Sequence, residues 1–373
     1  MSYLSIDTLQ NVLSERVFSH SKDSKKAAGR ALGTMIEIIS FYALKEWGFE
    51  KYISIERGLA EYGNPDITHN VEFTLHPLVF NEIIKLPTNY PITTKKIARY
   101  LDFNNNFAIK SNTLLDKERT IKNACVIAED DYTIVSSSIK EVSHDNIYIN
   151  IYQQIKKPYA MFECKRVGVE EGNKKGPQTI EKAKQGAYVA KTTSALQKIR
   201  DERGNVFGII YDKEKPIIES YPKLLRSIIK GNDKNLLKGF TLSVGIVSNH
   251  GNWFTSHNQN KELKVLAQSY DWLLFLTDMG LSQFISNLLL DPKTQYQAVQ
   301  KAFLNSYKEG KKSNIFTKVK MNYDAHIALT RYFHENIDTI ENWFNIITPN
   351  NNNIADLKQD LETLSQKDWR NIL

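Results

Sequence analysis

The sequence contains too few cysteines for a disulfide framework or a cysteine-based metal site. Only Cys125 and Cys164 occur among its 373 residues. Small secreted folds and structural zinc sites need more thiols, at short spacings. The eight histidines are scattered, and the close pair His250 and His257 has no cysteine partner in its loop. We therefore expect reduced thiols and a cytoplasmic protein.

Long apolar runs are also missing. No stretch of 18 or more apolar residues occurs, so the sequence predicts no transmembrane helix, and we expect no membrane partner. The first segment, "MSYLSIDTLQNVLSERVFSH", carries charges and has no small-residue cleavage site after an apolar core, so we do not expect a signal peptide. Because 41% of the residues are apolar and 11% aromatic, the chain can bury a sizeable core.

Acidic residues are outnumbered by basic ones. There are 42 Asp and Glu against 49 Lys and Arg, which gives a net charge of +7. This balance permits a polyanionic partner without requiring one. Basic groups such as "KAKQGAYVAKTTSALQKIR" (182–200) are typical of a solvated surface, but this one directly follows an unusual strand.

The unusual strand is contained in "YAMFECKRVG", from Tyr159 to Gly168. Residues two apart in a strand share one face, so Glu163 and Lys165 lie side by side. The flanking Met161 and Phe162 indicate a buried strand, in which an acid and a base are costly to desolvate. An exposed ion pair is the structural alternative. Because buried ionisable groups are often functional, we interpret the pair as catalytic and place it near a strand end.

Periodicity predicts the elements around this strand. The predicted elements are a helix over 26–47, strands over 132–137, 146–152 and 159–166, a helix over 178–200, and strands over 204–211 and 240–249. Residues 50–125 are mixed, with a strand expected around Val71 to Thr74. The order that matters is helix, three strands, helix, strand.

A second carboxylate is expected beside the pair. The turn "QIKKP" predicts a hairpin centred near Ile155 and Lys156, which would bring Asp145 beside Glu163 or Lys165. Asp130 and Asp131 are alternative acids from an earlier strand. Two carboxylates are what a hard cation such as Mg²⁺ needs, with water filling its other positions.

These residues and this order resemble the PD-(D/E)XK nuclease superfamily, and more narrowly a type II restriction endonuclease. The resemblance covers roughly residues 27–250. It implies that Asp145 and Glu163 bind Mg²⁺, that Lys165 positions or activates the attacking water, and that Glu37 on the first helix completes the metal site. Glu37 could instead be a boundary position of an amphipathic helix. The sequence has His144-Asp145 where the family has Pro-Asp, and we interpret the literal Pro65-Asp66 as a turn.

The predicted fold class is α/β. We expect a restriction-endonuclease-like core over 1–260, with a mixed central sheet flanked by helices and an insertion around 50–125. A mostly helical region over 261–373 would serve recognition or dimerisation, and it could pack on the core as one domain.

Two segments are candidates for contacts with DNA. The candidate residues are Gln178, Lys182 and Gln185 on the helix after the strand, and Asn249, His250 and Asn252 in the polar loop 248–260. Amide and imidazole side chains suit base edges in the major groove. The alternatives are a packed helix with Gly186 at a close contact and an ordinary surface loop.

The predicted function is that of a Mg²⁺-dependent type II restriction endonuclease, which hydrolyses phosphodiester bonds of double-stranded DNA at a specific sequence. A homodimer is expected, because duplex sites are often palindromic and each active site cuts one strand. The alternatives are a repair or recombination nuclease of the same fold, and a non-catalytic DNA-binding protein.

Overall fold

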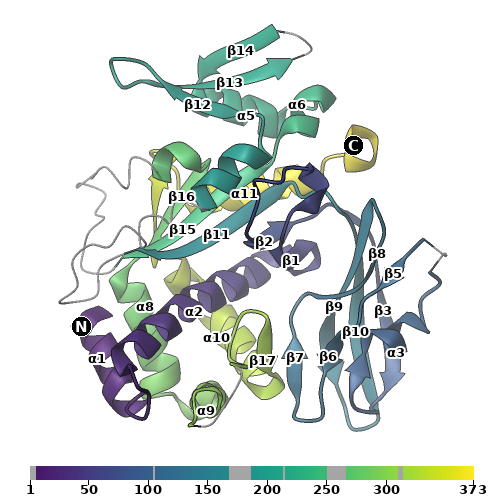
Figure 1. Ribbon diagram of the computed structural model, residues 1–373, viewed down its shortest axis with the longest axis vertical. Helices are drawn as coiled ribbons and strands as arrows, with labels where there is room; N and C mark the ends of the chain where they lie inside the picture. The colour runs from purple at the N-terminus through teal and green to yellow at the C-terminus, as the bar shows by residue number, and fades with distance from the viewer. Residues whose placement is uncertain (1–5, 104–105, 168–185, 213–214, 250–265, 310–313) are drawn as a thin grey trace. The chain divides into compact units, whose positions relative to one another are not determined.

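The computed structural model is a mixed α/β structure with several sheets, and it describes residues 6–103, 106–167, 186–212, 215–249, 266–309 and 314–373 (Figure 1). Two compact units interleave along the chain. The first comprises Met1–Ile55, Leu78–Lys156 and Thr277–Trp343, and the second comprises Glu56–Pro77, Lys157–Leu276 and Phe344–Leu373. The range 157–276 runs across the boundary that the sequence suggested near 260, so neither unit is one continuous segment.

The central sheet of the second unit contains the Glu163 strand near its middle. Its strand order is β1 (Ile53–Arg57), β2 (Val71–Leu75), β11 (Ala160–Val167), β15 (Leu242–Asn249), β16 (Trp272–Leu276) and β18 (Phe344–Thr348); the chain enters this unit within β1. β11 runs antiparallel to β2 and parallel to β15, and β15 runs parallel to β16. Central strands of this kind are covered on both faces, which explains their nearly continuous apolar runs.

The predicted hairpin between 146–152 and 159–166 is wrong. β10 (Asn146–Ile155) instead pairs with β3 (Leu78–Pro87) and β9 (Thr133–Val142), in the first unit. The reason lies in the two apolar patterns. β10 alternates apolar and polar residues, as expected of a strand buried on one face, whereas β11 is apolar at consecutive positions and needs cover on both faces.

The first unit contains two sheets and most of the longer helices. Its sheets are β3-β10-β9-β8-β5, completed by β8 (Cys125–Glu129) and β5 (Ala108–Ile109), and β17-β7-β6-β4, formed by β17 (Lys320–Asn322), β7 (Thr120–Lys122), β6 (Thr113–Leu115) and β4 (Ile92–Thr93). Its helices are α1 (Ile6–Arg16), α2 (Ser24–Leu44), α3 (Thr94–Ala98), α8 (Asp278–Ile285), α9 (Gln297–Ser306) and α10 (Tyr323–Glu341). α2 confirms the first predicted helix, and it begins where the Asp23 side chain accepts a hydrogen bond from the Lys26 amide.

The second unit completes its sheet with helices and a small separate sheet. Its helices are residues 186–193, α5 (Tyr221–Lys230), α6 (Lys234–Gly239), residues 266–269, α11 (Ile354–Ser365) and α12 (Trp369–Ile372). The small sheet consists of β12 (Gln197–Arg200), β13 (Val206–Asp212) and β14 (Lys215–Ser220). A short 3₁₀ turn of this unit is η3 (Ala60–Tyr62), and the first unit has the 3₁₀ and π turns η1 (Lys45–Phe49), η2 (Glu50–Tyr52), η4 (Ser286–Leu290) and η5 (Thr294–Tyr296).

Two of the helix predictions need correction in this unit. The helix expected to reach Arg200 gives way to strand β12 at Gln197. In the region expected to be mostly helical, Trp272–Leu276 is the buried strand β16, and Phe344–Thr348 is strand β18. Five consecutive buried apolar residues have no helical periodicity, and a sheet interior buries all of them.

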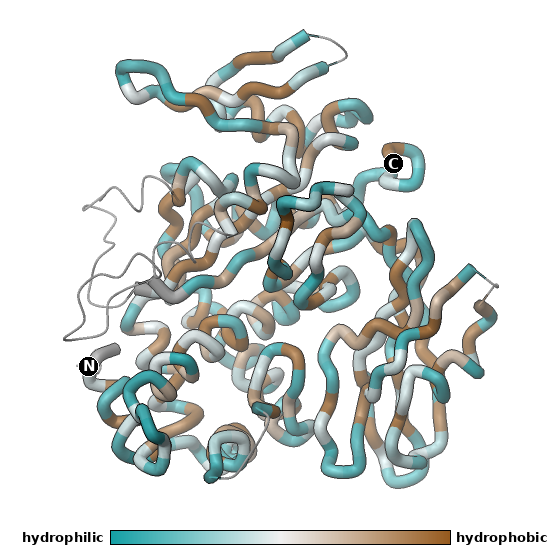
Figure 2. The backbone as a smooth tube through the Cα atoms, viewed as in Figure 1, coloured by the Kyte–Doolittle hydropathy of each residue, from teal (hydrophilic) through white to brown (hydrophobic). Residues whose placement is uncertain are grey.

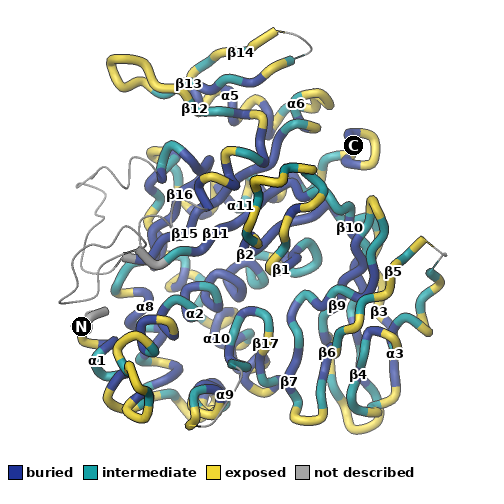
Figure 3. The backbone as a smooth tube through the Cα atoms, viewed as in Figure 1, coloured by how far each residue is buried: buried dark blue, intermediate teal, exposed yellow. Residues whose placement is uncertain are grey.

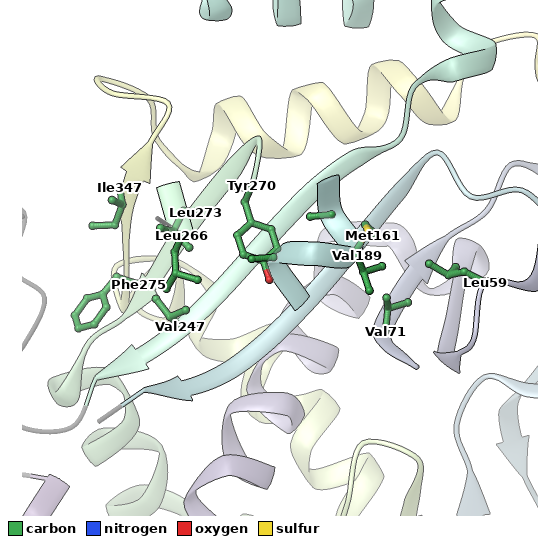
Figure 4. Packing of buried hydrophobic residues seen from close by; sticks show 12 residues of the cluster. Leu59, Val71, Met161, Val189, Val247, Leu266, Tyr270, Leu273, Phe275 and Ile347 are labelled. Carbon is green, nitrogen blue, oxygen red and sulfur yellow. The ribbon is translucent and has the colours of Figure 1, made fainter. Parts of the chain in front are cut away.

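The hydrophobic core of the second unit packs on one face of this sheet. It joins Met161 of β11, Val247 of β15 and Leu273 of β16 to Val189 of the helix 186–193 and to Tyr270 (Figure 4). Figure 3 shows β11, β15 and β16 as largely buried, and Figure 2 shows hydrophobic stretches along them. Met161, Glu163 and Lys165 have the same parity along β11, so the acid and base continue the row that this core begins. Among the described residues, no helix combines the length and apolarity needed to cross a membrane.

Candidate active site

Glu163 is a buried carboxylate without a complete set of partners. The residue is 1% exposed, and neither carboxylate oxygen accepts a hydrogen bond of good geometry from any residue that the structure describes. The side-chain nitrogens that contact it are Lys165 Nζ at 3.2 Å and His69 Nε2 at 3.4 Å. Charge-assisted hydrogen bonds are shorter, at about 2.8 Å. A buried carboxylate with such long contacts costs folding free energy, which makes Glu163 the candidate binding group of this sheet.

Glu72 supplies a second carboxylate from the neighbouring strand. β2 and β11 pair Phe73 with Phe162, so Glu72 and Glu163 come next on adjacent strands. Lys165 Nζ lies 3.5 Å from Glu72 Oε1 and 3.2 Å from Glu163 Oε2. The lysine therefore contacts both acids, and the partner of Glu163 comes from β2 rather than from the strand at 146–155.

The charges around Lys165 keep it protonated. Burial by itself would lower the pKa of Lys165, but the nearby charges of Glu163 and Glu72 outweigh it and raise the pKa above its ordinary value. Lys165 is consequently an ammonium at neutral pH. It can stabilise negative charge and donate hydrogen bonds, but it is not a base at that pH.

Two glycines allow a tyrosine and a helix to approach Glu163. A Cβ atom on Gly186 would lie 2.7 Å from Tyr270 Oη and 3.0 Å from Glu163 Cγ. A Cβ atom on Gly245, which is opposite Glu163 in β15, would lie 2.7 Å from the Tyr270 ring. These distances are too short for any side chain, so Gly186 lies at a close contact, as the alternative of a packed helix predicted. Burial and the charge of Glu163 raise the pKa of Tyr270, which stays a neutral phenol.

A buried polar network fixes the backbone next to Tyr270. Asp271 accepts hydrogen bonds from the Ser243 amide at 2.7 Å, from the Ser243 hydroxyl at 2.8 Å and from the Tyr221 hydroxyl. Lys198 donates to the carbonyl oxygen of Tyr270. Burial lowers the pKa of Lys198 to about 8, against the opposing charge of Asp271, and burial raises the pKa of Asp271. The network holds residues 270 and 271 in place, and with them the Tyr270 ring.

The structure does not bring Asp145 to Glu163 through strand pairing. Asp145 follows β9 in the turn before β10, in the first unit, and its side chain is 81% exposed. Its carboxylate contacts His144 Nδ1 at 2.7 Å. The hairpin that would have placed it beside Glu163 does not form, because β11 pairs with β2 and β15. The alternative acid Asp130 accepts hydrogen bonds from Tyr132 and Thr133 and so stabilises a turn.

Glu37 has a cation of its own in the first unit. Its Oε2 atom lies 3.0 Å from Lys318 Nζ and accepts a hydrogen bond from it. Glu163 belongs to the second unit. The position of Glu37 on the first helix is as predicted, but the structure gives it a lysine partner.

The predicted DNA-contacting residues lie where the structure gives no side-chain description. Those outside the described residues are Gln178, Lys182, Gln185, His250 and Asn252. Asn249 ends strand β15, and its side chain is likewise outside the description. Their roles stay predictions.

Sequence reasoning missed Glu72, His69 and Tyr270. For Glu72 a signal was available, because "VEFTL" places an acid inside an apolar strand just as "MFECK" does. The long range 78–156 separates β2 from β11 and conceals their pairing. Nothing local marks His69 or Tyr270, since both reach Glu163 only through the fold.

The donor set at Glu163 fits a hard divalent cation. In the part of the chain that the structure describes, no three His, Cys, Asp or Glu side chains form a ready-made metal-binding group. Two carboxylates are nevertheless sufficient for Mg²⁺, which keeps several waters when one or two carboxylates bind it. The two Glu163 oxygens, which lack a hydrogen-bond partner of good geometry among the described residues, have lone pairs that can bind such an ion.

The site combines two acidic and two basic side chains on one sheet of the second unit. Glu72, Lys165 and His69 lie around the buried Glu163. No protein-family model, curated protein or solved structure matches this chain.

Proposed function

We propose that this chain is a Mg²⁺-dependent endonuclease that hydrolyses phosphodiester bonds of double-stranded DNA, in the manner of a type II site-specific deoxyribonuclease. The observation that carries the proposal is the Glu163 carboxylate, which is buried, lacks hydrogen bonds from described residues and has Glu72 and Lys165 beside it. The Glu163 oxygens have lone pairs available to bind a metal cation, and the ammonium group of Lys165 lies beside them.

The residue types suit phosphodiester hydrolysis. Glu163 and Glu72 would hold Mg²⁺, which when bound makes a water more acidic and neutralises charge on the phosphate. Lys165 stays an ammonium, and it donates a hydrogen bond to the attacking water or to a phosphate oxygen. Tyr270 and the helix at Gly186 pack closely around Glu163 and limit the orientations that its side chain can adopt.

The order of elements supports the resemblance to the PD-(D/E)XK superfamily. In chain order, α2, β1, β2, β11, the helix 186–193 and β15 give helix, three strands, helix, strand, with β12, β13, β14, α5 and α6 between that helix and β15. Glu72 on the second of these strands then takes the role that the resemblance implied for Asp145, with Glu163-Cys164-Lys165 on the third. In this assignment the range 78–156 is an insertion between the second and third strands.

The expected partners are double-stranded DNA and a second copy of the chain. The net charge of +7 favours a polyanion. A duplex has two strands to cut, and one centre of this kind cuts one of them, so a two-fold homodimer follows by symmetry.

Incubation of the purified chain with plasmid and phage DNA, with and without millimolar Mg²⁺, tests the proposal. We expect discrete fragments that disappear with EDTA and with Glu163→Gln. A smear of fragments would indicate a repair or recombination nuclease instead. Salt-sensitive binding without cleavage of any DNA would overturn the proposal in favour of a non-catalytic DNA-binding protein.

A further inference from the structure

His69 places an imidazole nitrogen against one oxygen of Glu163. His69 precedes β2, and its Nε2 atom lies 3.4 Å from Glu163 Oε1. Lys165 contacts the other oxygen, Oε2, at 3.2 Å. The Nε2 atom is buried and has no hydrogen-bond partner among the described residues. The Oε1 side of the carboxylate therefore faces a nitrogen lone pair or proton, while the Oε2 side faces an ammonium.

The separation of these two atoms is typical of two ligands on one ion. Donors that bind a metal at about 2.1 Å and subtend about 90–109° lie about 3.0–3.4 Å apart. A charge-assisted hydrogen bond between them would measure about 2.8 Å. The observed 3.4 Å belongs to the first range and lies outside the second.

A second His–Glu pair in the chain provides an internal reference. His334 Nδ1 lies 2.8 Å from Glu46 Oε1 and forms a hydrogen bond with it. The His334 side chain is largely exposed to solvent, whereas the Glu163 side chain is fully buried. The same two residue types thus form an ordinary surface bond at one place and an open, unbonded pair at the other.

We propose that His69 is a metal ligand together with Glu163, and that its nitrogen makes the site prefer Mn²⁺ or Co²⁺ over Mg²⁺. Mg²⁺ takes oxygen ligands, whereas imidazole suits transition-metal ions and raises their affinity along the Irving–Williams order. The inference rests on the site of the proposed function but not on its reaction, because metal binding needs no DNA.

Isothermal titration calorimetry on the full chain, freed of metal with EDTA and without DNA, tests this inference. Mn²⁺, Co²⁺ and Mg²⁺ are titrated separately into the wild type, His69→Ala, Glu163→Gln and the matched control His334→Ala. We expect Co²⁺ to bind at least about tenfold more tightly than Mg²⁺. His69→Ala should lower the Co²⁺ affinity by about 10- to 100-fold and change the Mg²⁺ affinity far less.

The remaining variants locate the ion. Glu163→Gln should weaken the binding of all three ions, and His334→Ala should weaken none. The visible absorption of bound Co²⁺ should change in His69→Ala, because a nitrogen ligand is lost, and circular dichroism checks that each variant is folded.

Several outcomes would overturn the inference. One is an unchanged Co²⁺ affinity in His69→Ala, and another is an equal loss in His334→Ala. An unchanged Co²⁺ affinity in Glu163→Gln would place the ion elsewhere. Metal binding through His69 without DNA cleavage would retain this inference and reject the proposed function, whereas Mg²⁺-dependent cleavage that is indifferent to His69 would do the opposite.

Discussion

Two Glu–Lys pairs in this protein differ in which of their side chains is buried. In one pair the lysine is buried, and in the other the glutamate is. In the first unit, Lys318 is nearly buried and donates a 3.0 Å hydrogen bond to Glu37, whose side chain is 26% exposed. In the second unit the carboxylate of Glu163 is buried, and Lys165 is the partner that reaches the surface, at 3.2 Å. In the first pair, the buried Lys318 donates a hydrogen bond to its partner. The second leaves its buried carboxylate unsatisfied, as a binding site does before its ligand arrives.

Substitutions in the two pairs should differ most in their effect on the rate of DNA cleavage. Lys165→Met should lower Mg²⁺-dependent cleavage by about 10²–10³-fold, because the ammonium that stabilises charge on the phosphate is lost. Glu163→Gln should have an effect at least as large. Lys318→Met, the matched change in the other pair, should leave cleavage of folded protein unaltered. Rates of plasmid cleavage measure all three, and equal losses would show that both pairs act through stability.

A second pair of substitutions tests whether Glu72 or Asp145 is the carboxylate that acts with Glu163 and Lys165. Glu72→Gln should reduce cleavage by about 10²-fold, since it removes a carboxylate from the site. Asp145→Asn should leave cleavage within about twofold, because Asp145 is exposed and contacts His144. If Asp145→Asn alone abolished cleavage, the assignment implied by the family resemblance would be restored.

The order of the two pairs should reverse for stability: the change in the Glu37–Lys318 pair should lower the free energy of unfolding more than the change in the Glu163–Lys165 pair. Lys318→Met removes the ammonium that donates a hydrogen bond to Glu37. We expect it to lower the free energy of unfolding by about 1–3 kcal/mol, less than for a fully buried pair because Glu37 reaches solvent. Glu163→Gln should leave the free energy unchanged or raise it, since a poorly paired buried charge disappears. Urea denaturation of both variants tests the contrast, and a large loss for Glu163→Gln would contradict it.

One glycine in each unit should respond to substitution by alanine with opposite signs. Gly186→Ala forces a Cβ atom toward Tyr270 and Glu163, and we expect a loss of about 1–3 kcal/mol in unfolding free energy together with slower cleavage. Gly33 in α2 has no neighbour within 4 Å of its ideal Cβ position. Gly33→Ala should therefore stabilise the protein by up to about 1 kcal/mol. Thermal denaturation distinguishes the two signs.

The smallest effect is a pH dependence from the network beside the site. Burial lowers the pKa of Lys198 from 10.5 to about 8. Between these values the unfolded chain holds a proton that the folded chain has released, so stability from this group rises with pH by up to about 1.4 kcal/mol per unit. Below pH 8 both states are protonated and this contribution is constant. Denaturation curves should show the rise in the wild type and not in Lys198→Met, and equal slopes would contradict it.

Local pattern was sufficient for many of the elements. The helix at α2 and the strands β9, β10, β11, β13 and β15 follow from hydrophobic periodicity, which depends on neighbours along the chain. The placement of Glu163 and Lys165 in a buried strand follows from the same signal. β16 was misread, because a short continuous apolar run does not distinguish a strand from a helix.

Hydrophobic pattern alone placed an acid and a base in one buried strand. Which side chains contact them depends on how distant strands pair. Strand pairing closes loops as long as 78–156, and no local signal specifies which strand fills the edge of another. That closure placed Glu72 beside Glu163, brought His69 and Tyr270 to the same carboxylate, and left Asp145 in an exposed turn, because β11 needed cover on both faces and β10 did not.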